Sequence, residues 1–454
     1  MLNVELNTPI MTLNAIEYTI NCIFNIVGLK ETFELQVASN RKKVILRLNN
    51  KKIFFNLLTE DKILKLLNRE ITLNKILSAD KAVEIPIILE KDAEFVTIKE
   101  EVLCVNADIL SISFILLSRY EEFHYDSRDD IGNFEYKNSL AFFYNFIDYP
   151  IVDEYAMLLR PYLRNFLPEI EFTTNKYQII PSHDIDELYR YKRDLIGFRR
   201  IVFDLLLKPN CRKKDYLTNV FNKEKDPFNE SIYTLLHDSQ RLNLEAEFYF
   251  MTAKKSKLNR GYNILDFDMD KFVGLSKRGN QKIGLHGGFG TRNNLELFRL
   301  EKMKLESATK LDISITRQHY LNFEIKETPN LMEENGIRVD SSLGYNEQEG
   351  FRCGTCHEYR LWDFRNNCEF KLIERPLIVM DITLFKHKAY SKKEAIHSIF
   401  KLNSRCIAVG GKFTILWHNT YVIDFKEWYE DVYIHALESI CKLNCCIDPD
   451  FSIG

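Results

Sequence analysis

Ionisable side chains follow five short apolar runs in the second half of the chain, each at the point where the run ends. In chain order these side chains are His183, Asp184, Asp186, His286, Arg317, His319, Asp340 and His418. Carboxylates and neutral imidazoles are ligands of catalytic zinc, and the same groups exchange protons in general acid–base catalysis. Five unrelated coincidences would be unusual, so the pattern indicates that this half of the chain is an enzyme.

The first of these runs carries the densest group. In an extended backbone, Asp184 and Asp186 face the same side because they are two residues apart. Two carboxylates on one side repel each other unless a cation or a proton lies between them. One interpretation is a metal-binding carboxylate beside a general base. The alternative is a pair of solvated loop aspartates, or an N-cap for the next helix.

His286 ends another run and is followed by Gly-Gly-Phe-Gly-Thr. Glycines allow the backbone to approach a ligand closely, and a neutral imidazole is a common metal ligand. These two features favour a ligand-binding histidine. A core or loop histidine is the alternative and, for a histidine taken alone, the commoner case.

Seven apolar runs in this half of the chain have the length and composition of strands. They cover residues 177–181, 246–251, 282–286, 313–316, 337–339, 371–379 and 412–417. Helical patterning covers residues 195–207, 231–242, 268–277, 294–309, 329–335, 392–402 and 425–442. This alternation predicts an α/β fold with a parallel sheet, either open or closed into a barrel. In such folds reactive groups gather at the carboxyl ends of strands, where the ionisable residues above are found.

The first part of the chain has a different character. It mixes short strand-like runs with helix-like stretches and contains no chemical motif. We therefore expect an α+β N-terminal domain of unknown role over residues 1–172 and the catalytic domain over residues 173–454.

At the residues named above, the sequence resembles the polysaccharide deacetylase (NodB-type) family over about residues 176–450, with the motifs in the family's order. The resemblance implies a distorted (β/α) barrel of about seven parallel strands. It also implies a divalent metal ion, zinc above all. In the family's first motif, Asp184 takes the place of the general base and Asp186 that of a metal ligand.

The second family motif, His-Ser/Thr-x-x-His, is incomplete in this sequence. His286 matches its first histidine, but the position of the second is Gly290. The family's usual set of one aspartate and two histidines therefore lacks a member. His319 is our candidate for the missing ligand, because it lies at the end of the next expected strand.

The remaining motifs imply roles for further residues. Arg317 matches the arginine that pairs with the catalytic aspartate, although the proline usual in that motif is absent. Asp340 resembles the aspartate that orients the acid histidine, and His418 matches the general acid of the motif Leu-x-His. The aromatic side chains proposed for the floor of a sugar site, or alternatively for packing inside the barrel, are Tyr320, Tyr345 and Trp417.

Several blocks also resemble a subgroup that carries an extra N-terminal domain and is common among bacterial genes for surface polysaccharide synthesis. They are SRYEEF, PIVDEYA, GLHGGFG, TRQHYL and VDSSLGY. For SRYEEF, a structural helix that packs against the second domain is favoured over a role in substrate binding. For Cys353, Cys356 and His357, in the stretch that follows VDSSLGY, a substrate-loop or structural role is favoured over metal binding.

Composition limits the remaining choices. Lysine and arginine number 62 and aspartate and glutamate 65, so a net charge of −3 offers no basic excess for nucleic acid. The N-terminus lacks the pattern of a signal peptide, and the most apolar run, residues 109–117, is too short for a membrane span. Ten irregularly spaced cysteines fit reduced thiols in a cytoplasmic protein.

The sequence therefore predicts a cytoplasmic, metal-dependent enzyme that hydrolyses an N-acetyl or O-acetyl group on a sugar or polysaccharide precursor. Its partner would be a carbohydrate, with no nucleic acid and no membrane span. Two alternatives stay open. One is an inactive deacetylase-like protein that binds sugar or scaffolds polysaccharide assembly, for which Gly290 is the motive. The other is a hydrolase of a non-sugar amide.

Overall fold

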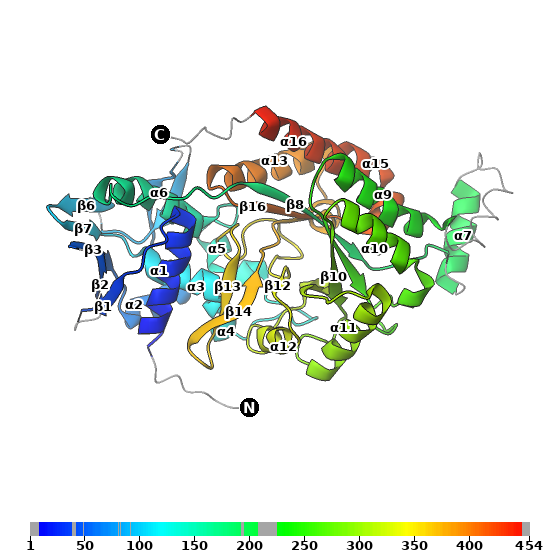
Figure 1. Ribbon diagram of the computed structural model, residues 1–454, viewed down its shortest axis with the longest axis horizontal. Helices are drawn as coiled ribbons and strands as arrows, with labels where there is room; N and C mark the ends of the chain where they lie inside the picture. Colours follow the sequence, from blue (N-terminus) through cyan, green and yellow to red (C-terminus); the bar gives the residue numbers. More distant parts are fainter. Residues whose placement is uncertain are drawn as a thin grey trace.

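The computed structural model describes residues 9–38, 42–48, 50–79, 81, 83–90, 92–191, 195–207 and 225–446. Within these residues the strands form a five-stranded sheet, a nine-stranded sheet and a two-stranded pair. Figure 1 shows the five-stranded sheet at one end of the molecule and the nine-stranded sheet among helices nearer its centre. No described helix has both the length and the apolar character needed to cross a lipid bilayer.

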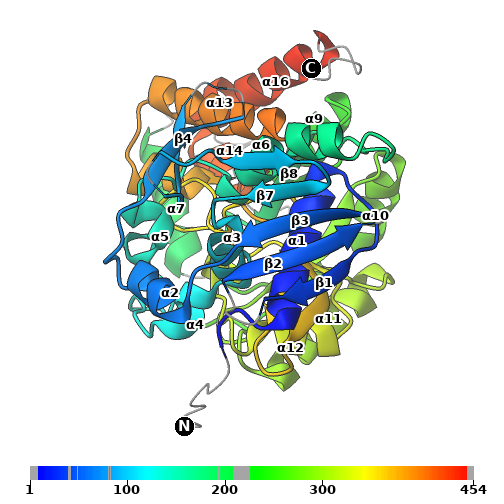
Figure 2. The same ribbon diagram turned by 90° about the vertical axis from the view of Figure 1, so that its left-hand side faces the viewer.

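The N-terminal part of the chain is built on the five-stranded sheet, in the order β1-β2-β3-β7-β6. The strands are β1 (Glu34–Val37), β2 (Lys43–Leu48), β3 (Lys51–Asn56), β6 (Val96–Lys99) and β7 (Val102–Val105). Side chains alternate along β2 and β3, so Val44, Leu46, Ile53 and Phe55 are buried. Figure 2 looks onto this sheet, with α1 (Leu13–Val27) behind it.

The other elements of this part complete its core. They are α2 (Glu60–Leu67), β4 (Asn74–Leu77), β5 (Glu84–Ile87), α3 (Ile109–Ser118), α4 (Tyr120–His124), η1 (Tyr136–Asn138), α5 (Leu140–Phe143) and α6 (Ile151–Phe166). The most apolar run, residues 109–117, lies in α3, and every residue of α3 is buried. This helix is therefore an internal support rather than a membrane element.

The nine-stranded sheet has the order β13-β14-β12-β11-β10-β9-β8-β16-β15. Its strands are β8 (Gln178–Ile185), β9 (Glu247–Met251), β10 (Lys282–Gly287), β11 (Ile315–Gln318), β12 (Val339–Asp340), β13 (Tyr359–Asp363), β14 (Cys368–Glu374), β15 (Val379–Met380) and β16 (Lys412–Leu416). Every neighbouring pair is parallel except β13 with β14. The predicted α/β class with a parallel sheet is confirmed. Among the described strands, edges β13 and β15 do not pair with each other, so a closed barrel stays a prediction.

One expected strand is wrong. Residues 371–379 were expected to form a single strand, but β14 ends at Glu374 and β15 begins at Val379, beside β16. Pro376 lies between the two strands. A proline has no N–H for a ladder hydrogen bond, so the chain leaves one part of the sheet there and joins another.

Helices flank the nine-stranded sheet. They are α7 (Leu195–Leu207), α9 (Pro227–Arg241), α10 (Met269–Arg278), α11 (Leu295–Thr309), α12 (Thr328–Glu334), α13 (Lys392–Ala408), α14 (Asn419–Asp424), α15 (Lys426–Trp428) and α16 (His435–Cys446). Short 3-10 and π segments accompany them: η3 (Ile264–Asp266), η4 (His319–Leu321), η5 (Thr383–His387) and η6 (Tyr429–Ile434). In Figure 1, α13 and α16 lie above the sheet and α11 and α12 below it.

A buried ion network joins the two parts of the chain. Arg119, at the start of the block SRYEEF, pairs with Glu122 through Nε at 2.8 Å. Glu122 also accepts two hydrogen bonds from Arg352, at 2.7 and 2.9 Å. All three side chains are at most 2% exposed. The block therefore packs against the C-terminal part, as its structural interpretation predicts, while the predicted boundary near residue 172 stays a prediction.

Candidate metal centre

Asp186, His286 and His319 lie together at the carboxyl ends of three strands. Asp186 follows β8, His286 is near the end of β10, and His319 follows β11. One ligand atom from each residue lies within 4.8 Å of the other two. The Nε2 atom of His286 is 3.2 Å from Oδ1 of Asp186, and Nε2 of His319 is 3.7 Å from the same oxygen. The structure thus brings together the three residues that were expected to bind metal.

Both imidazoles are held by their other ring nitrogen. Nδ1 of His286 is 3.0 Å from the carbonyl oxygen of Arg317, which can only accept a hydrogen bond. Nδ1 of His319 is 3.2 Å from Oδ1 of Asn259. A partner on Nδ1 fixes the ring and leaves the Nε2 lone pair for a metal, as in many metal sites. Asn259 was not recognised from the sequence, because nothing marks it except its contact with His319.

Two buried atoms of this group have no other hydrogen-bond partner. Among the described residues, Nε2 of His286 and Oδ1 of Asp186 make no hydrogen bond of good geometry. Buried polar atoms are nearly always paired, so an unpaired set of ligand atoms calls for an ion or a water. One carboxylate and two imidazoles match the ligands of catalytic zinc sites, which keep a position open for water and substrate. The residues therefore fit a divalent metal ion.

The charges in the group support the same conclusion. Burial opposes ionisation of Asp186, but His319, His286 and His418 outweigh it and lower the pKa of this carboxyl. Burial also lowers the pKa of His319 to about 4, so its imidazole is neutral at physiological pH, despite Asp186 nearby. For His286 the effect of burial is outweighed by Asp184 and Asp186, which raise the pKa. Asp184 and Asp186 thus favour a proton on His286. A metal cation in place of that proton would balance the negative charge of the same two carboxylates.

Asp184 lies beside this group and is paired with Arg317. Its Oδ1 is 3.1 Å from Nη1 of Arg317, and its Oδ2 is 3.7 Å from Nε2 of His286. The guanidinium is fully buried and also donates to Ser182 and to Ser341. Because β8 and β11 are not neighbours in the sheet, this contact requires the sheet to curl. The expected pairing of Arg317 with Asp184 is present in the structure.

His418 stands on the other side of Asp186, with an aspartate behind it. Its Nε2 is 3.9 Å from Oδ2 of Asp186, and its Nδ1 is 2.8 Å from Oδ1 of Asp381. The backbone N–H of His418 donates to the other carboxylate oxygen of Asp381, at 2.7 Å. Burial alone would lower the pKa of His418, but Asp381 and then Asp186 and Asp184 raise it to about 10. The imidazole is therefore cationic at neutral pH.

The partner of His418 is thus Asp381, and the expected pairing with Asp340 is wrong. Asp340 lies on β12, and among the described residues no hydrogen bond or ion pair joins it to His418, whose Nδ1 contacts Asp381 instead. The carboxylate of Asp340 accepts hydrogen bonds from Ser342 and faces Glu374 on β14. Asp381 directly follows β15, so the rule that found the other site residues also applies to it once β15 is recognised as a separate strand.

Glu374→Gln is expected to make the fold less sensitive to rising pH. Burial and then the neighbouring Asp340 raise the pKa of Glu374, and burial raises that of Asp340 to about 6. A carboxyl whose pKa is higher in the folded state contributes stability below its unfolded pKa and loses it as pH rises through the folded value. The free energy of unfolding should therefore fall as pH rises above the ordinary pKa of a carboxyl group, about 4.

Urea unfolding at about pH 5 and about pH 8 measures this difference. The variant should lose less stability than the wild type over the interval, because one of the two acids can no longer ionise. Equal losses in the two proteins would contradict the coupling of Asp340 and Glu374.

The three aromatic residues expected at a sugar site separate in the structure. Tyr320 is 40% exposed, and its ring centroid lies 4.2 Å from that of His319. Tyr345 and Trp417 are only 6% and 1% exposed, and Trp417 stacks on Tyr433. Buried rings cannot form an open floor, so the expectation is wrong for these two residues. For Trp417 the alternative of interior packing holds.

The remaining sequence features at the site have simple structural explanations. His183 is buried, its Nδ1 lies 3.0 Å from the carbonyl oxygen of Trp417, and burial lowers its pKa to about 4. It is not part of the ligand group.

Gly290 has a φ of 103°, a left-handed conformation that a histidine would adopt only with strain. The second imidazole of the ligand group is accordingly supplied from the end of another strand, by His319.

A family model matches the N-terminal part of the chain, and two solved structures align with 60% of it. A family model described as a family of unknown function (DUF7033) matches residues 4–168. No curated protein matches the chain. A solved structure from Mycobacterium smegmatis, assigned as a polysaccharide deacetylase, aligns with 13% identity and a TM-score of 0.36 over 60% of this chain and 86% of its own. A mutant of a CE4-family pseudoenzyme with restored activity aligns with 11% identity and a TM-score of 0.30 over 60% and 64%. Neither structure is similar enough to indicate an activity.

Proposed function

We propose that the chain is a metal-dependent hydrolase that removes an acetyl group from a carbohydrate. The proposal is carried by one observation, the convergence of Asp186, His286 and His319 with an acid and a base on either side of them. The carbohydrate class comes from the resemblance of the sequence motifs to polysaccharide deacetylases. A role in bacterial surface polysaccharide metabolism is part of the same proposal.

Asp186, His286 and His319 would hold the ion, and zinc is the metal that best fits their donor set. When bound, such an ion lowers the pKa of a coordinated water towards about 7 and polarises the acetyl carbonyl. The carboxyl ends of β8, β10 and β11 hold these side chains in position before the substrate binds. The entropy cost of ordering them is therefore met when the chain folds and not again in each catalytic cycle.

Asp184 is the general base in this proposal. Its carboxylate lies between Arg317 and His286, within reach of a water at the ligand group. Arg317 is held by Ser182 and Ser341, so its guanidinium fixes the direction of the Asp184 carboxylate. Asp184 would take the proton of the attacking water.

His418 is the general acid. Its raised pKa keeps a proton on the ring at neutral pH, and Asp381 holds Nδ1 so that Nε2 is the atom that faces Asp186. His418 would give its proton to the leaving nitrogen of an N-acetyl group, or to the leaving oxygen of an O-acetyl group. Of the three aromatic residues first considered, Tyr320 is the exposed one, and in this proposal it would contact a sugar ring.

Release of acetate tests the proposal directly. The purified full-length chain, stripped with a chelator and reloaded with zinc, is incubated with acetylated oligosaccharides and with nucleotide sugars that carry N-acetyl groups. We expect acetate release that requires zinc and an accompanying free amine or hydroxyl on the sugar. Zinc-loaded protein that binds these sugars but releases no acetate from any of them would overturn the proposal.

Asp381→Asn is expected to lower kcat by roughly 100-fold while the metal content stays the same. An asparagine keeps a similar shape but lacks the charge that raises the pKa of His418 to about 10. The imidazole then loses its proton at a lower pH, so the basic limb of the kcat profile should move to lower pH. A profile with an unchanged basic limb would show that Asp381 does not control the acid.

The second candidate is a sugar-binding protein without activity. It was motivated by Gly290 in place of a metal-binding histidine. Because His319 supplies a third donor in the ligand group, that observation no longer favours the inactive protein.

A further inference from the structure

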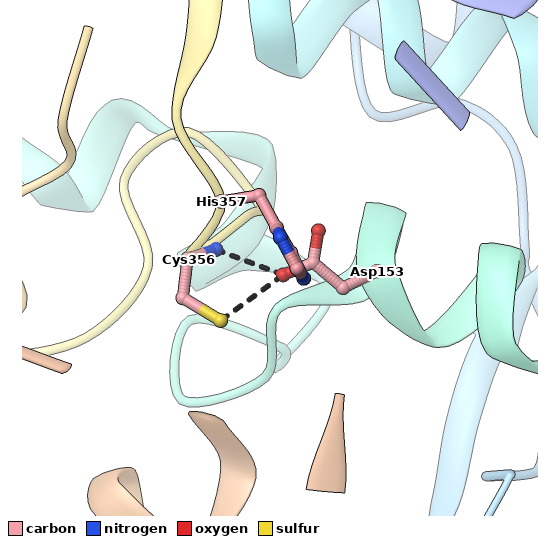
Figure 3. A group of neighbouring side chains, drawn as sticks. All are labelled: Asp153, Cys356 and His357. Atoms are coloured by element: carbon pink, nitrogen blue, oxygen red, sulfur yellow. Dashed lines mark hydrogen bonds between the residues drawn. The ribbon is translucent and has the colours of Figure 1, made fainter. Parts of the chain in front are cut away.

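A second group of metal-binding side chains lies between the two parts of the chain. Asp153 comes from α6, and Cys356 and His357 come from the loop between β12 and β13. One ligand atom from each residue lies within 4.8 Å of the other two. Figure 3 shows the three side chains close together, with hydrogen bonds from the backbone N–H and the thiol of Cys356 to the carboxylate of Asp153. The group shares no residue with the candidate metal centre.

The carboxylate of Asp153 is buried, and within the described part of the chain no lysine or arginine pairs with it. Its side chain is 0% exposed, and Cys356 is 1% exposed. It accepts hydrogen bonds from Oγ1 of Thr355 at 2.5 Å, the backbone N–H of Cys356 at 2.8 Å and Sγ of Cys356 at 3.2 Å. Among the described residues, Asp153 makes no ion pair with a lysine or an arginine. A buried carboxylate is costly unless hydrogen bonds and a positive charge compensate it. Burial raises the pKa of Asp153, and the neighbouring His357 and the hydrogen bonds only partly oppose that shift.

His357 is oriented as a metal-binding histidine usually is. Its Nε2 lies 3.0 Å from the carbonyl oxygen of Val409, at the end of α13. A carbonyl only accepts, so Nε2 carries the proton and the lone pair is on Nδ1. A backbone carbonyl that fixes the tautomer in this way is the common outer partner of metal-bound histidine.

We propose that Asp153, Cys356 and His357 form a second metal site, a structural zinc site that ties α6 to the loop before β13. Thiolate, imidazole and carboxylate are all zinc ligands, and thiolate selects zinc over magnesium or calcium. The thiol of Cys406, on α13, interacts with that of Cys356 but does not belong to the ligand group. On binding, the sulfur electron pair of Cys356 goes to the cation, and the S–H proton, which now points to Asp153, leaves to solvent.

The site is reachable from the surface. His357 is half-buried and, with Thr355 and Gly410, lines a cavity of about 680 Å³ that also contacts α1. Of the three ligands, His357 is therefore the one that faces the cavity. The same placement explains a sequence feature that the proposed hydrolase does not use, the His357 that directly follows the Cys-x-x-Cys pair.

Cobalt distinguishes this site from the candidate metal centre, which contains no thiol. The full-length chain is stripped of metal and titrated with Co²⁺ alone, and the near-ultraviolet charge-transfer absorption of a cobalt–thiolate bond is recorded. We expect this band to appear as the thiolate site fills, to reach its maximum by two Co²⁺ per chain, when both sites are occupied, and to be displaced by Zn²⁺. Saturation with Co²⁺ without a thiolate band would overturn the proposal, whatever the outcome of the acetate assay.

Cys356→Ser should abolish the band, and Cys353→Ser is the matched control. Cys353 is also buried and belongs to the same Cys-x-x-Cys pair, but it lies outside the ligand group. Its variant should keep the band at full intensity. A band that survives in Cys356→Ser would overturn the proposal. If that variant does not fold, His357→Gln on the more exposed ligand is expected to weaken Co²⁺ binding by at least about 10-fold, and an unchanged affinity would overturn the proposal equally.

Discussion

Replacing Asp184 with asparagine is expected to abolish acetate release while the zinc of the candidate metal centre stays bound. The amide can still accept the hydrogen bond of Arg317, 3.1 Å away, but it cannot take a proton from water. Loss of a general base costs typically about 100- to 10,000-fold in rate. The ligand set of Asp186, His286 and His319 is untouched, so metal content should not change.

The measurement pairs kcat with elemental analysis of the same sample. Asp312→Asn is the matched control, because Asp312 is 73% exposed and lies on the same part of the chain. It should behave as the wild type does. Circular dichroism is needed for Asp184→Asn, since removing one charge of a buried pair can cost about 3–5 kcal/mol. A folded Asp184→Asn protein with the wild-type rate would show that the base is another residue.

His319→Ala should remove both the metal and the activity. His319 is the residue that the sequence motif does not provide, and its imidazole is the third donor of the group. Changes to outer partners of metal ligands already weaken binding by about 10- to 100-fold, so loss of a ligand itself should exceed about 100-fold. Zinc content should fall by one equivalent per chain.

His397→Ala serves as the control for a lost imidazole. His397 lies on α13 and is exposed, so its variant should keep both metal and activity. An unchanged zinc content in His319→Ala would leave only Asp186 and His286 as ligands. It would then favour the binding-only protein that Gly290 first suggested.

The part of the site that sequence reasoning found depends on a local rule. A polar residue that directly follows an apolar run lies at the carboxyl end of a strand, and parallel strands end at one edge of a sheet. Asp186, His286 and His319 satisfy this rule and lie together. The ligand that departs from the family motif was found by position, because position is what the rule supplies.

The part that sequence reasoning missed depends on contacts across the sheet. Asp340 and Asp381 both follow or end an apolar run, and the sequence does not say which strand lies beside β16. In the structure β15 does, so Asp381 reaches His418. The same limit applies to Asp153 and Cys356, which meet from positions 203 residues apart.

The sequence also does not indicate which aromatic residues near the site are buried. Trp417 and Tyr320 each sit next to a site histidine in the chain, yet one is 1% and the other 40% exposed. Trp417 precedes His418 as the sheet ends and packs on Tyr433, whereas Tyr320 lies in a left-handed turn with a φ of 60°. Residue type alone does not distinguish a core ring from a sugar-binding ring.

The most direct test of the account is the position of zinc in crystals of the zinc-loaded chain, located by anomalous scattering at the zinc absorption edge. We expect an anomalous-difference peak at roughly 2.0–2.2 Å from one carboxylate oxygen of Asp186 and from Nε2 of both His286 and His319. Zinc that is absent from this position, or that is bound there without His319, would contradict it.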